Sequence, residues 1–293
     1  MAVTAAVVSW NTRELLERCL RSLEPEVEAG RLRAWVVDNG SSDGSAQAAR
    51  SLAAWAEVVE PGSNLGFGRA VNLVAARTES EWLLVANADV ALEPGALAAL
   101  LAAGSDPRIA CVAPRLIGPD GATEHSVYPF PTLWFTTAFN LGLHRLSARS
   151  ADRLCLEGYW DPDRPRAVPW AIGACLLVRR QAFEQAGGFD ERQWLFAEDL
   201  ELGWRLRDRG WVTWYEPTAR VLHDSGAATR PAFGPERDAR FMTETYALIA
   251  RRRGRAGALA TALLNVFGAV VRLNRQWLRA HLNGAREAIR SPR

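Results

Sequence analysis

Two acidic residues stand where short apolar runs of the chain end, and such positions suit ligand binding. Asp38 ends the apolar run of VVDNGSSDGS at 36–45, and Asp89 follows that of LLVANADV at 83–90. In open α/β sheets, ligands bind beyond the carboxyl ends of the strands, so carboxylates at neighbouring strand ends would share one crevice. Either residue taken singly is more readily explained as an ordinary turn or cap residue.

A glycine-containing segment, NLGFGRAVN at 64–72, is the second candidate. It has the pattern of a turn that runs into a helix, which exposes backbone amides to a phosphate or a nucleotide. Gly66 and Gly68 have the G-x-G spacing of a dinucleotide fingerprint, but the third glycine is absent and the segment does not follow the first strand. On its own this motif is a weak signal.

The segment WLFAEDLELGWRLRDRG at 194–210 places Glu198 and Asp199 at the start of a helix. Acidic residues favour that end through the helix dipole, so a purely structural role is a serious alternative. Trp194 and Phe196 would form an aromatic wall beside them. A carboxyl group shielded in this way has a raised pKa, which suits it to abstract a proton.

His223, in VLHDSG at 221–226, follows the last strand pattern and could bind a divalent metal as a neutral imidazole. A structural histidine is the alternative interpretation. The chain has four histidines and four cysteines without a His/Cys cluster, which argues against a zinc site. We expect the cysteines to be buried thiols of a reducing compartment.

The apolar runs predict strands buried on both faces, because they are short, continuous and bounded by polar or turn residues. They lie at 5–10, 34–37, 82–86 and 109–113. Helical spacing of apolar residues follows Asn11 or Thr12 as a cap, and further helices are expected after Ser42-Asp43 and over 67–77. This alternation predicts an α/β fold with a mostly parallel sheet and right-handed crossovers.

The second half of the chain is less regular. Residues 118–170 are rich in proline, glycine and aromatics, and we expect an irregular segment with one apolar helix near 132–146. A strand at 171–178, a turn at Gly187-Gly188, a helix from near Glu198 and a strand at 211–215 follow. One or two helices are expected after residue 250.

Composition excludes several classes of protein. Of 293 residues, 48% are hydrophobic and 23% charged, which is the balance of a globular protein with one large or two small domains. The sequence has no run of 18 apolar residues, so we expect no standard membrane-spanning helix. The N-terminal MAVTAAVVSW has no basic region, so we expect no signal peptide.

A strongly basic tail is hidden in the net charge of +2, because residues 251–293 hold ten arginines and one acid. Residues 257–271 are uncharged and lie between arginine clusters. As a helix they would extend about 22 Å, short of the roughly 30 Å hydrocarbon core of a bilayer. We expect a helix in the membrane interface whose arginines face anionic headgroups. A dimerisation helix or a helix packed on the main domain is the alternative. No base-reading element accompanies the tail, so nucleic acid is not an expected partner.

Taken in order over residues 4–226, the motifs resemble an inverting family 2 glycosyltransferase of the GT-A fold, in its rhamnosyltransferase-like branch. They are VVSWN (7–11), VVDNGSSDGS (36–45), NLGFGRAVN (64–72), NAD (87–89), GACLLVRR (173–180), GGFDE (187–191), AEDLEL (197–202) and VLHDSG (221–226). Each motif is modest and the ordered set is specific. The resemblance implies a GT-A, Rossmann-like domain over 1–245 and a basic helical tail over 246–293.

The resemblance also implies roles for individual residues. Asp38 would hydrogen-bond N3 of a uracil or thymine, while Asp89 and His223 would bind Mg²⁺ or Mn²⁺ at the donor diphosphate. Asp199, beside Glu198, would be the general base for the acceptor hydroxyl that attacks and inverts the anomeric carbon. Further donor contacts would come from Ser9, Asn39, Asn64, Gly66, Asn72 and Asn87. The acceptor cleft would include Gly173, Trp194 and Phe196.

Two departures from the family pattern bear on the activity. The metal motif begins with Asn87 rather than aspartate, which we interpret as a variant frequent in this branch. The Q-x-x-R-W sequence of processive polysaccharide synthases is missing from the sequence, so transfer of one or a few sugars is expected.

The sequence therefore predicts a hexosyltransferase that moves a sugar, with rhamnose the leading candidate, from a dTDP- or UDP-sugar to a cell-envelope glycan or a lipid-linked acceptor. Its expected location is the cytoplasmic face of the cell membrane, and a homodimer is left open. A sugar-phosphate nucleotidyltransferase is one alternative, although SWNT at 9–12 lacks the glycine-rich loop such enzymes carry there. An inactive membrane-bound scaffold of the same fold is another.

Overall fold

The computed structural model describes residues 3–227 and 229–290, which form two compact units. The sheet unit comprises residues 3–128, 161–194 and 198–227. The helical unit comprises residues 129–160, 195–197 and 229–290. The domain boundary predicted at residues 245 and 246 stays a prediction, and one helix, α10 (Arg237–Val271), runs through it.

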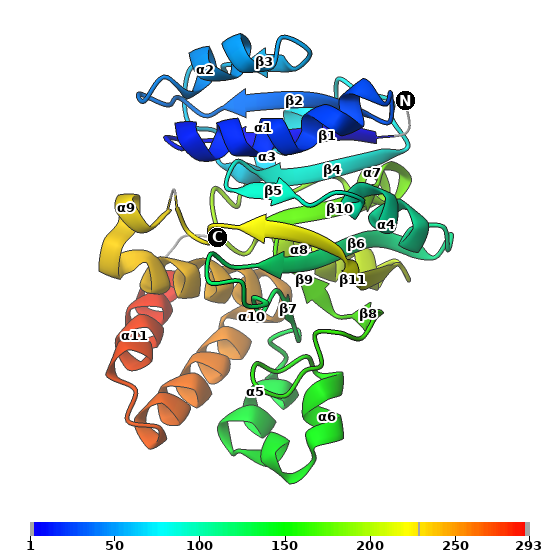
Figure 1. Ribbon diagram of the computed structural model, residues 1–293. Helices are drawn as coiled ribbons and strands as arrows, with labels where there is room; N and C mark the ends of the chain where they lie inside the picture. The colour runs from blue at the N-terminus through cyan, green and yellow to red at the C-terminus, as the bar shows by residue number, and fades with distance from the viewer. Residues whose placement is uncertain (1–2, 228, 291–293) are drawn as a thin grey trace. The chain divides into compact units, whose positions relative to one another are not determined.

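The first half of the sheet unit alternates strands and helices, as the apolar runs predict. Its strands are β1 (Val3–Ser9), β2 (Leu32–Asp38), β3 (Glu57–Val59) and β4 (Trp82–Asn87). Its helices are α1 (Arg13–Glu28), α2 (Ser45–Leu52) and α3 (Phe67–Ala75). The four strands are parallel in the spatial order β3-β2-β1-β4 (Figure 1), and the helices supply the crossovers that parallel neighbours need.

The remaining strands make the central sheet mixed. They are β5 (Val90–Leu92), β6 (Ile109–Ile117), β8 (Arg166–Val168), β10 (Cys175–Arg179) and β11 (Val212–His223). Strand β10 lies antiparallel between β4 and β6, and β11 is parallel to β6 but antiparallel to β5 and β8. Two short strands, β7 (Val127–Tyr128) and β9 (Trp170–Ala171), pair separately. The α/β class is confirmed, with parallel pairing confined to β3-β2-β1-β4 and β6–β11.

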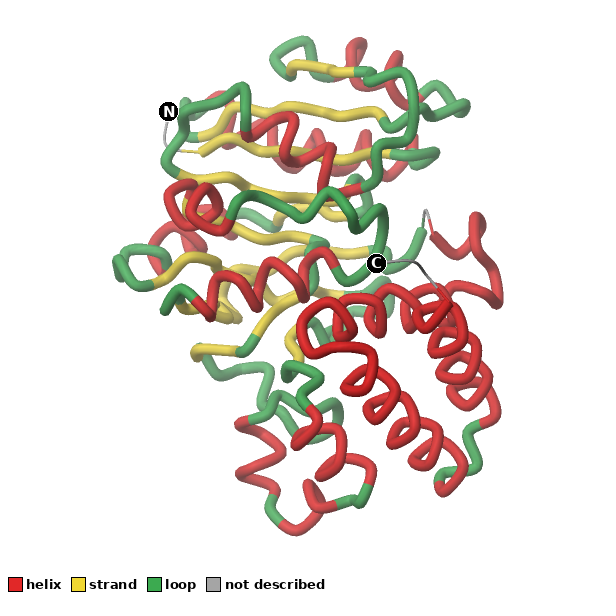
Figure 2. Tube along the Cα trace, turned by 180° about the vertical axis from the view of Figure 1, so that it is seen from behind, coloured by secondary structure: helices red, strands yellow, loops and turns green. Residues whose placement is uncertain are grey.

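Helices cover both faces of this sheet. Successive side chains of a strand point to opposite faces, and one set packs with Leu16 and Leu20 of α1 in the main core. Helix α4 (Ala96–Ala103) joins this core through Leu97 and Leu100. Helix α1 stands before the sheet in Figure 1 and α3 before it in the reverse view of Figure 2. Helices α7 (Arg180–Ala186) and α8 (Glu198–Asp208) complete the sheet unit.

The apolar run at 171–178 is divided, although one strand was predicted. Ala171 ends β9, residues 173–174 form a turn, and β10 begins only at Cys175. Every residue of the run except Ile172 is buried, so burial alone gave no sign of the turn. The last strand, β11, is longer than the predicted 211–215 and ends at His223.

The helical unit contains only helices among the residues described in it. The first group is α5 (Leu133–Asn140), the 3₁₀ turn η1 (Leu143–Leu146) and α6 (Ala148–Arg153). The second is α9 (Thr229–Phe233), the 3₁₀ turn η2 (Gly234–Glu236), α10 and α11 (Arg275–Arg290). The single helix predicted near 132–146 is broken because Gly142 has a φ of 74°, outside the helical region. Two helices were allowed after residue 250, and α10 begins earlier than expected.

Helix α10 is interrupted at Gly254, whose φ of 78° and ψ of 163° are not helical. Within the described ranges, α10 is the one helix long and apolar enough to cross a membrane by length and composition alone. The sequence has no run of 18 apolar residues, but α10 qualifies because a hydropathy average tolerates charges within the window. The expectation of no standard membrane-spanning helix stays a prediction. The part after Gly254 extends about 26 Å, below the roughly 30 Å of a hydrocarbon core. Helix α11 packs along α10 (Figure 2).

Candidate active site

Strand register brings three predicted site residues to one edge of the sheet. Ser9, the last residue of β1, pairs with Asp38 of β2. On the other side of β1, Val8 pairs with Asn87 of β4. The carboxyl ends of these parallel strands therefore meet, as the spacing of the apolar runs predicts. We call this edge the carboxyl edge.

The antiparallel strand β10 brings the predicted base to the same edge. Cys175 pairs with Ala86, and the Asn87 amide donates a hydrogen bond of 2.9 Å to the carbonyl of Ala174. The preceding residue, Gly173, donates its amide hydrogen to Asp199 Oδ2 at 2.9 Å. Asp199, in the first turn of α8, is thus tied to the end of β4 through two residues of one turn.

Asp38 is buried and only partly satisfied. It is 1% exposed, and its Oδ1 accepts a hydrogen bond of 2.7 Å from the Ser41 amide. Its Oδ2 atom has no hydrogen-bond partner among the described residues, and neither has Oδ1 of the neighbouring Asn39. Buried polar atoms are normally paired, so two adjacent acceptors without partners indicate a place for a ligand that donates hydrogen bonds.

The turn at 64–66 is held close to this pair. Asn39 Nδ2 donates to the Gly66 carbonyl at 3.3 Å, and Asn64 Oδ1 accepts from the Gly66 amide at 2.9 Å. Trp194 Nε1 donates to the Asn64 carbonyl at 3.2 Å. A Cβ atom at Gly66 would lie 2.0 Å from the carbonyl oxygen of Trp194, so no other residue fits there. Gly68 is similarly crowded, with 2.8 Å to Phe189 Cβ. The G-x-G spacing therefore serves close packing.

Asp89 and His223 come together where β5 meets β11. His223 pairs with Val90, and the Asp224 amide donates to the Asp89 carbonyl at 3.0 Å. Both side chains are at least nine-tenths buried, and His223 Nε2 lies 3.7 Å from Asp89 Oδ1. The Asp89 Oδ1 atom has no hydrogen-bond partner in the described part of the chain. A carboxylate oxygen and an imidazole nitrogen thus face one another without a bond between them.

Glu124 completes this group, and the sequence analysis missed it. Its Oε2 lies 2.7 Å from His223 Nδ1. A tight turn at 118–121 sends the chain back along β6, where the Glu124 amide donates to the Leu116 carbonyl at 2.9 Å. The turn sequence GPDG was a usable hairpin signal, because proline and glycine stand at positions that turns favour.

Burial and charge act in opposite directions on this group. Burial raises the pKa of Asp89, although the His223 charge opposes it. Burial alone would lower the pKa of His223, but the hydrogen bond that its ring donates to Glu124 and the charge of Asp89 raise it overall. Both shifts favour the protonated forms of these side chains when no cation is bound.

The pKa of Asp199 is raised, mainly because its carboxyl group is removed from solvent. The amides of Gly173 and Leu200 oppose this shift by donating hydrogen bonds of 2.9 and 2.7 Å. The two residues before α8, Phe196 and Ala197, have φ angles of 67° and 61°. Non-glycine residues seldom adopt such angles, and consecutive cases are typical of functional segments.

Some predicted site residues are engaged elsewhere. The Asn72 side-chain amide exchanges two hydrogen bonds of 2.9 Å with the backbone of Phe189. Phe196 belongs to the helical unit, where its ring packs 6.3 Å from Phe233 and 6.0 Å from Phe241. Trp194 belongs to the sheet unit, so the two rings do not form a common wall within one unit. Glu198 is buried in the first turn of α8. The functional roles of Asn72, Phe196 and Glu198 stay predictions.

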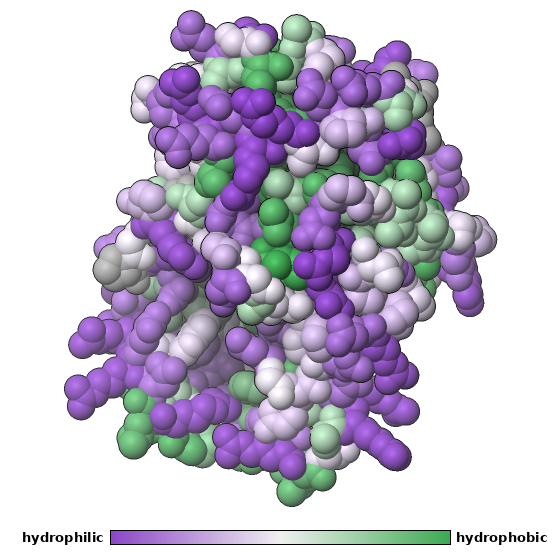
Figure 3. All heavy atoms as spheres, in the orientation of Figure 1, coloured by the Kyte–Doolittle hydropathy of each residue, from purple (hydrophilic) through white to green (hydrophobic). Residues whose placement is uncertain are grey.

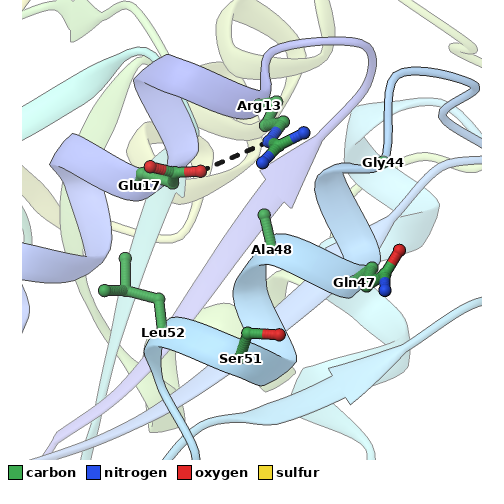
Figure 4. Close-up of a pocket in the computed structure, with 7 residues that line it drawn as sticks. All are labelled: Arg13, Glu17, Gly44, Gln47, Ala48, Ser51 and Leu52. Atoms are coloured by element: carbon green, nitrogen blue, oxygen red, sulfur yellow. Dashed lines mark hydrogen bonds and ion pairs between the residues drawn. The ribbon is translucent and has the colours of Figure 1, made fainter.

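A cavity of about 440 Å³ lies between α1 and α2 (Figure 4). Arg13 and Glu17 border it on α1 and form an ion pair of 3.3 Å, and Gln47 and Ser51 border it on α2. None of the candidate residues lines this cavity, so it is separate from the site described above. No group of three or more His, Cys, Asp or Glu side chains suited to a metal ion is found within 3–227 and 229–290.

Comparison with known proteins agrees with this geometry. Residues 4–187 match the model of glycosyl transferase family 2. Over 238 residues, 76% of each chain, the protein is 36% identical to N-acetylglucosaminyl-diphospho-decaprenol L-rhamnosyltransferase of Mycobacterium tuberculosis. It is 27% identical to rhamnosyltransferase WbbL of Escherichia coli over 131 residues, 44% of this chain and 46% of WbbL.

The fold has solved counterparts as well. The mannosyltransferase PcManGT of Pyrobaculum calidifontis, solved with GDP-Man and Mn²⁺, superposes with a TM-score of 0.62 at 16% identity. The match covers 99% of this chain and 87% of that one. The predicted GT-A fold and rhamnosyltransferase-like resemblance are confirmed, and the nucleotidyltransferase alternative loses its support. The chain belongs to glycosyl transferase family 2.

Proposed function

We propose that this glycosyltransferase moves a single sugar, with inversion, from a dTDP- or UDP-sugar to a lipid-linked glycan of the cell envelope. Rhamnose as the sugar and an N-acetylglucosaminyl-diphospho-polyprenol as the acceptor are supported by the name of the mycobacterial relative. The observation that carries the proposal is the carboxyl edge, where Asp38 ends β2, Asp89 follows the end of β4, and the turn before β10 donates a hydrogen bond to Asp199.

Asp38 is proposed to read the base of the donor. The buried Oδ2 atom has no partner among the described side chains and amides. The N3–H of uracil or thymine is a single donor that such an acceptor would satisfy. One carboxylate oxygen accepts this hydrogen from either base, so Asp38 selects uracil or thymine over bases that present an acceptor at this position.

Asp89 and His223 are proposed to hold a divalent cation, Mg²⁺ or Mn²⁺. The residues fit such an ion, because a buried carboxylate oxygen faces an imidazole nitrogen across 3.7 Å. Two protein ligands leave the other coordination positions to the donor diphosphate and water. When bound, the cation would neutralise the charge that develops on the nucleoside-diphosphate leaving group.

Glu124 is proposed as a positioning residue. By accepting the hydrogen of Nδ1, it would keep Nε2 of His223 free of hydrogen and turned toward Asp89. Partners of this kind orient metal-binding histidines, and their loss typically weakens metal affinity by about 10–100-fold.

Asp199 is proposed as the general base. Its carboxylate would take the proton of the acceptor hydroxyl while the hydroxyl oxygen forms a bond to the anomeric carbon and the bond to the donor diphosphate breaks. The backbone amides of Gly173 and Leu200 orient the carboxylate. A single displacement of this kind inverts the anomeric centre and needs no enzyme nucleophile.

Attachment through the basic tail would place the enzyme on the cytoplasmic membrane face, where a lipid-linked acceptor is exposed.

Thermal unfolding with UDP, dTDP, GDP, ADP and NAD, each with and without Mn²⁺, tests the donor site. A nucleotide at 100 times its Kd should stabilise the protein by about 2.7 kcal/mol. We expect stabilisation by dTDP or UDP that requires Mn²⁺ and is lost in Asp89→Ala. Stabilisation by NAD alone, or by no nucleotide, would contradict the proposal.

Transfer itself is tested with dTDP-rhamnose and a short-chain polyprenyl diphosphate carrying N-acetylglucosamine. We expect one sugar to be added with inverted anomeric configuration. Donor binding without transfer to any such acceptor would support the inactive scaffold instead.

A further inference from the structure

A leucine in an unfavourable conformation marks one end of the helical unit. Leu273 lies in the turn between α10 and α11 with a φ of 53° and is 87% exposed. Glycine or asparagine usually occupies this left-handed position after a helix, because a bulkier side chain strains the backbone there. Neither the turn nor contact with water favours leucine at this position.

The last part of α10 presents a matching apolar stripe. Leu259, Leu263, Phe267 and Val270 recur three or four residues apart, and all four side chains are exposed. Residues with this spacing share one face of a helix. The buried positions of the same stretch are small residues, among them Ala258, Ala262 and Ala269. The last part of α10 therefore buries a face of small residues. Its exposed face is apolar, whereas the exposed face of a helix in a soluble protein is usually polar.

Helix α5 and η1 bring further apolar side chains to the same end. Trp134 is 72% exposed and Leu146 is 82% exposed. Arg272, beside Leu273, donates a hydrogen bond of 3.1 Å to Asn140 Oδ1, and its guanidinium lies 4.9 Å from the centre of the Phe139 ring. These contacts join the end of α5 to the α10–α11 turn.

Two segments far apart in sequence thus bring exposed apolar side chains to one end of the helical unit, which we call the apolar tip. Figure 3 shows two groups of apolar atoms, in green, at this end of the helical unit, with hydrophilic residues between and around them. The residues that define the tip are Trp134, Leu141, Leu146, Phe267, Val270 and Leu273.

Exposed arginines stand next to the residues of the apolar tip in the sequence. Arg145 and Arg149 flank Leu146, Arg275 and Arg279 follow the turn, and all four are exposed. In a symmetric dimer the same patch faces itself, which would bring these like charges together. A partner with an apolar interior and a negatively charged surface would match both the apolar side chains of the tip and its arginines.

We propose that the apolar tip docks on an anionic lipid bilayer, with its leucines and aromatics in the interface and its arginines at the headgroups. This arrangement is typical of peripheral membrane attachment. The proposal rests on the proposed function, in which the acceptor is lipid-linked. It extends that function by adding residues 134–146 to the membrane contact of the tail.

Sedimentation with phosphatidylcholine vesicles, with and without phosphatidylglycerol, tests the proposal on the full chain. We expect binding to the phosphatidylglycerol vesicles that falls about tenfold or more in Leu273→Asn and in Leu146→Asp, in line with removal of one inserted leucine. The Tm of Leu273→Asn should be unchanged or higher, since asparagine tolerates the left-handed conformation. Ala54→Asp adds the same charge to an exposed site of the sheet unit and should bind as the wild type does.

The proposal is overturned if the wild-type protein does not sediment with phosphatidylglycerol vesicles. It is also overturned if both leucine variants bind these vesicles as well as the wild type does. A wild-type dimer that Leu273→Asn converts to a monomer without lipid, seen by light scattering, would assign the tip to a second copy instead. Vesicle binding is measured without donor or acceptor. Intact vesicle binding without sugar transfer would therefore count against the proposed function alone.

Discussion

Among the described residues, the carboxyl edge and the apolar tip both leave groups without partners, but the groups are polar and buried at the edge and apolar and exposed at the tip. The edge buries polar atoms that find no partner in the described chain, Asp38 Oδ2 and Asp89 Oδ1 among them. The tip exposes leucines that find no apolar cover, and one of them holds a strained backbone. Buried unpaired polar atoms and an exposed strained leucine both cost free energy, and we propose that a ligand offsets that cost at each place. The proposed ligands are a nucleotide and a cation at the carboxyl edge and lipid at the apolar tip.

The largest effect expected at the carboxyl edge is that of Asp199→Asn. Without a base for the acceptor proton, the transfer rate should fall by about 10²–10⁴-fold, while the Kd for dTDP or UDP stays within a factor of two or so. Single-turnover transfer and calorimetric titration measure the two quantities. The matched control is Asp208→Asn at the other end of α8. Equal loss of donor affinity and rate would mean that Asp199 holds the donor.

Variants at the proposed cation site should distinguish Asp89, the proposed ligand, from Glu124, the proposed positioning residue. Asp89→Ala is expected to abolish Mn²⁺-dependent nucleotide binding, whereas Glu124→Gln should weaken Mn²⁺ affinity by about 10–100-fold and retain binding at saturating Mn²⁺. Mn²⁺ titration followed by electron paramagnetic resonance reports this directly. Glu93→Gln, which breaks a surface ion pair with Arg220, is the control and should change nothing. Unaltered Mn²⁺ affinity in Glu124→Gln would remove Glu124 from the site.

Gly66, beside the carboxyl edge, is restricted both by its positive φ and by its close contact with Trp194. Gly62→Ala and Gly66→Ala both place a side chain at positive φ, 82° and 81°, which costs about 1–2 kcal/mol. Only Gly66→Ala also meets the Trp194 carbonyl at 2.0 Å, whereas nothing lies within 4 Å of a Cβ at Gly62. Denaturant unfolding should show the larger loss for Gly66→Ala, together with weaker nucleotide binding. Equal losses would mean that Trp194 moves aside freely.

The smallest effect is expected from a histidine inside the helical unit. Burial lowers the pKa of His281 to about 4, and its Nδ1 lies 2.8 Å from the Tyr246 hydroxyl. The unfolded chain therefore binds this proton at higher pH than the folded chain does. Stability from this group should be complete above about pH 6.5 and be lost as the pH falls toward 4. Comparing Tm against pH for the wild type and His281→Asn isolates the contribution, and parallel profiles would contradict it.

The carboxyl edge was largely predictable from sequence, because each of its strands is a continuous apolar run that ends in a polar residue. Asp38, Asn87 and Asp89 stand directly after such runs, and parallel strands bring these ends together. Glu124 was not predictable in the same way. It reaches His223 through a hairpin whose residues, 118–124, have no apolar periodicity, so only the register of the returning chain shows the contact.

The apolar tip was half predictable. The uncharged stretch at 257–271 between arginines indicated a surface-seeking helix from the sequence alone. Its joining to Trp134 and Leu146 depends on Arg272, which contacts Phe139 and Asn140 more than 130 residues earlier. The common wall of Trp194 and Phe196 stays a prediction, since these two residues of one motif belong to different compact units.

The sequence by itself determined the α/β alternation, the positions of the acidic residues at strand ends and the family to which the chain belongs, because these depend on local periodicity and on motif order. The tertiary structure alone decided the antiparallel course of β10, the pairing of Glu124 with His223 and the assembly of the apolar tip. Each of these depends on which distant segments become neighbours. Strand register and long-range packing determine that choice, and local residue preferences do not encode it.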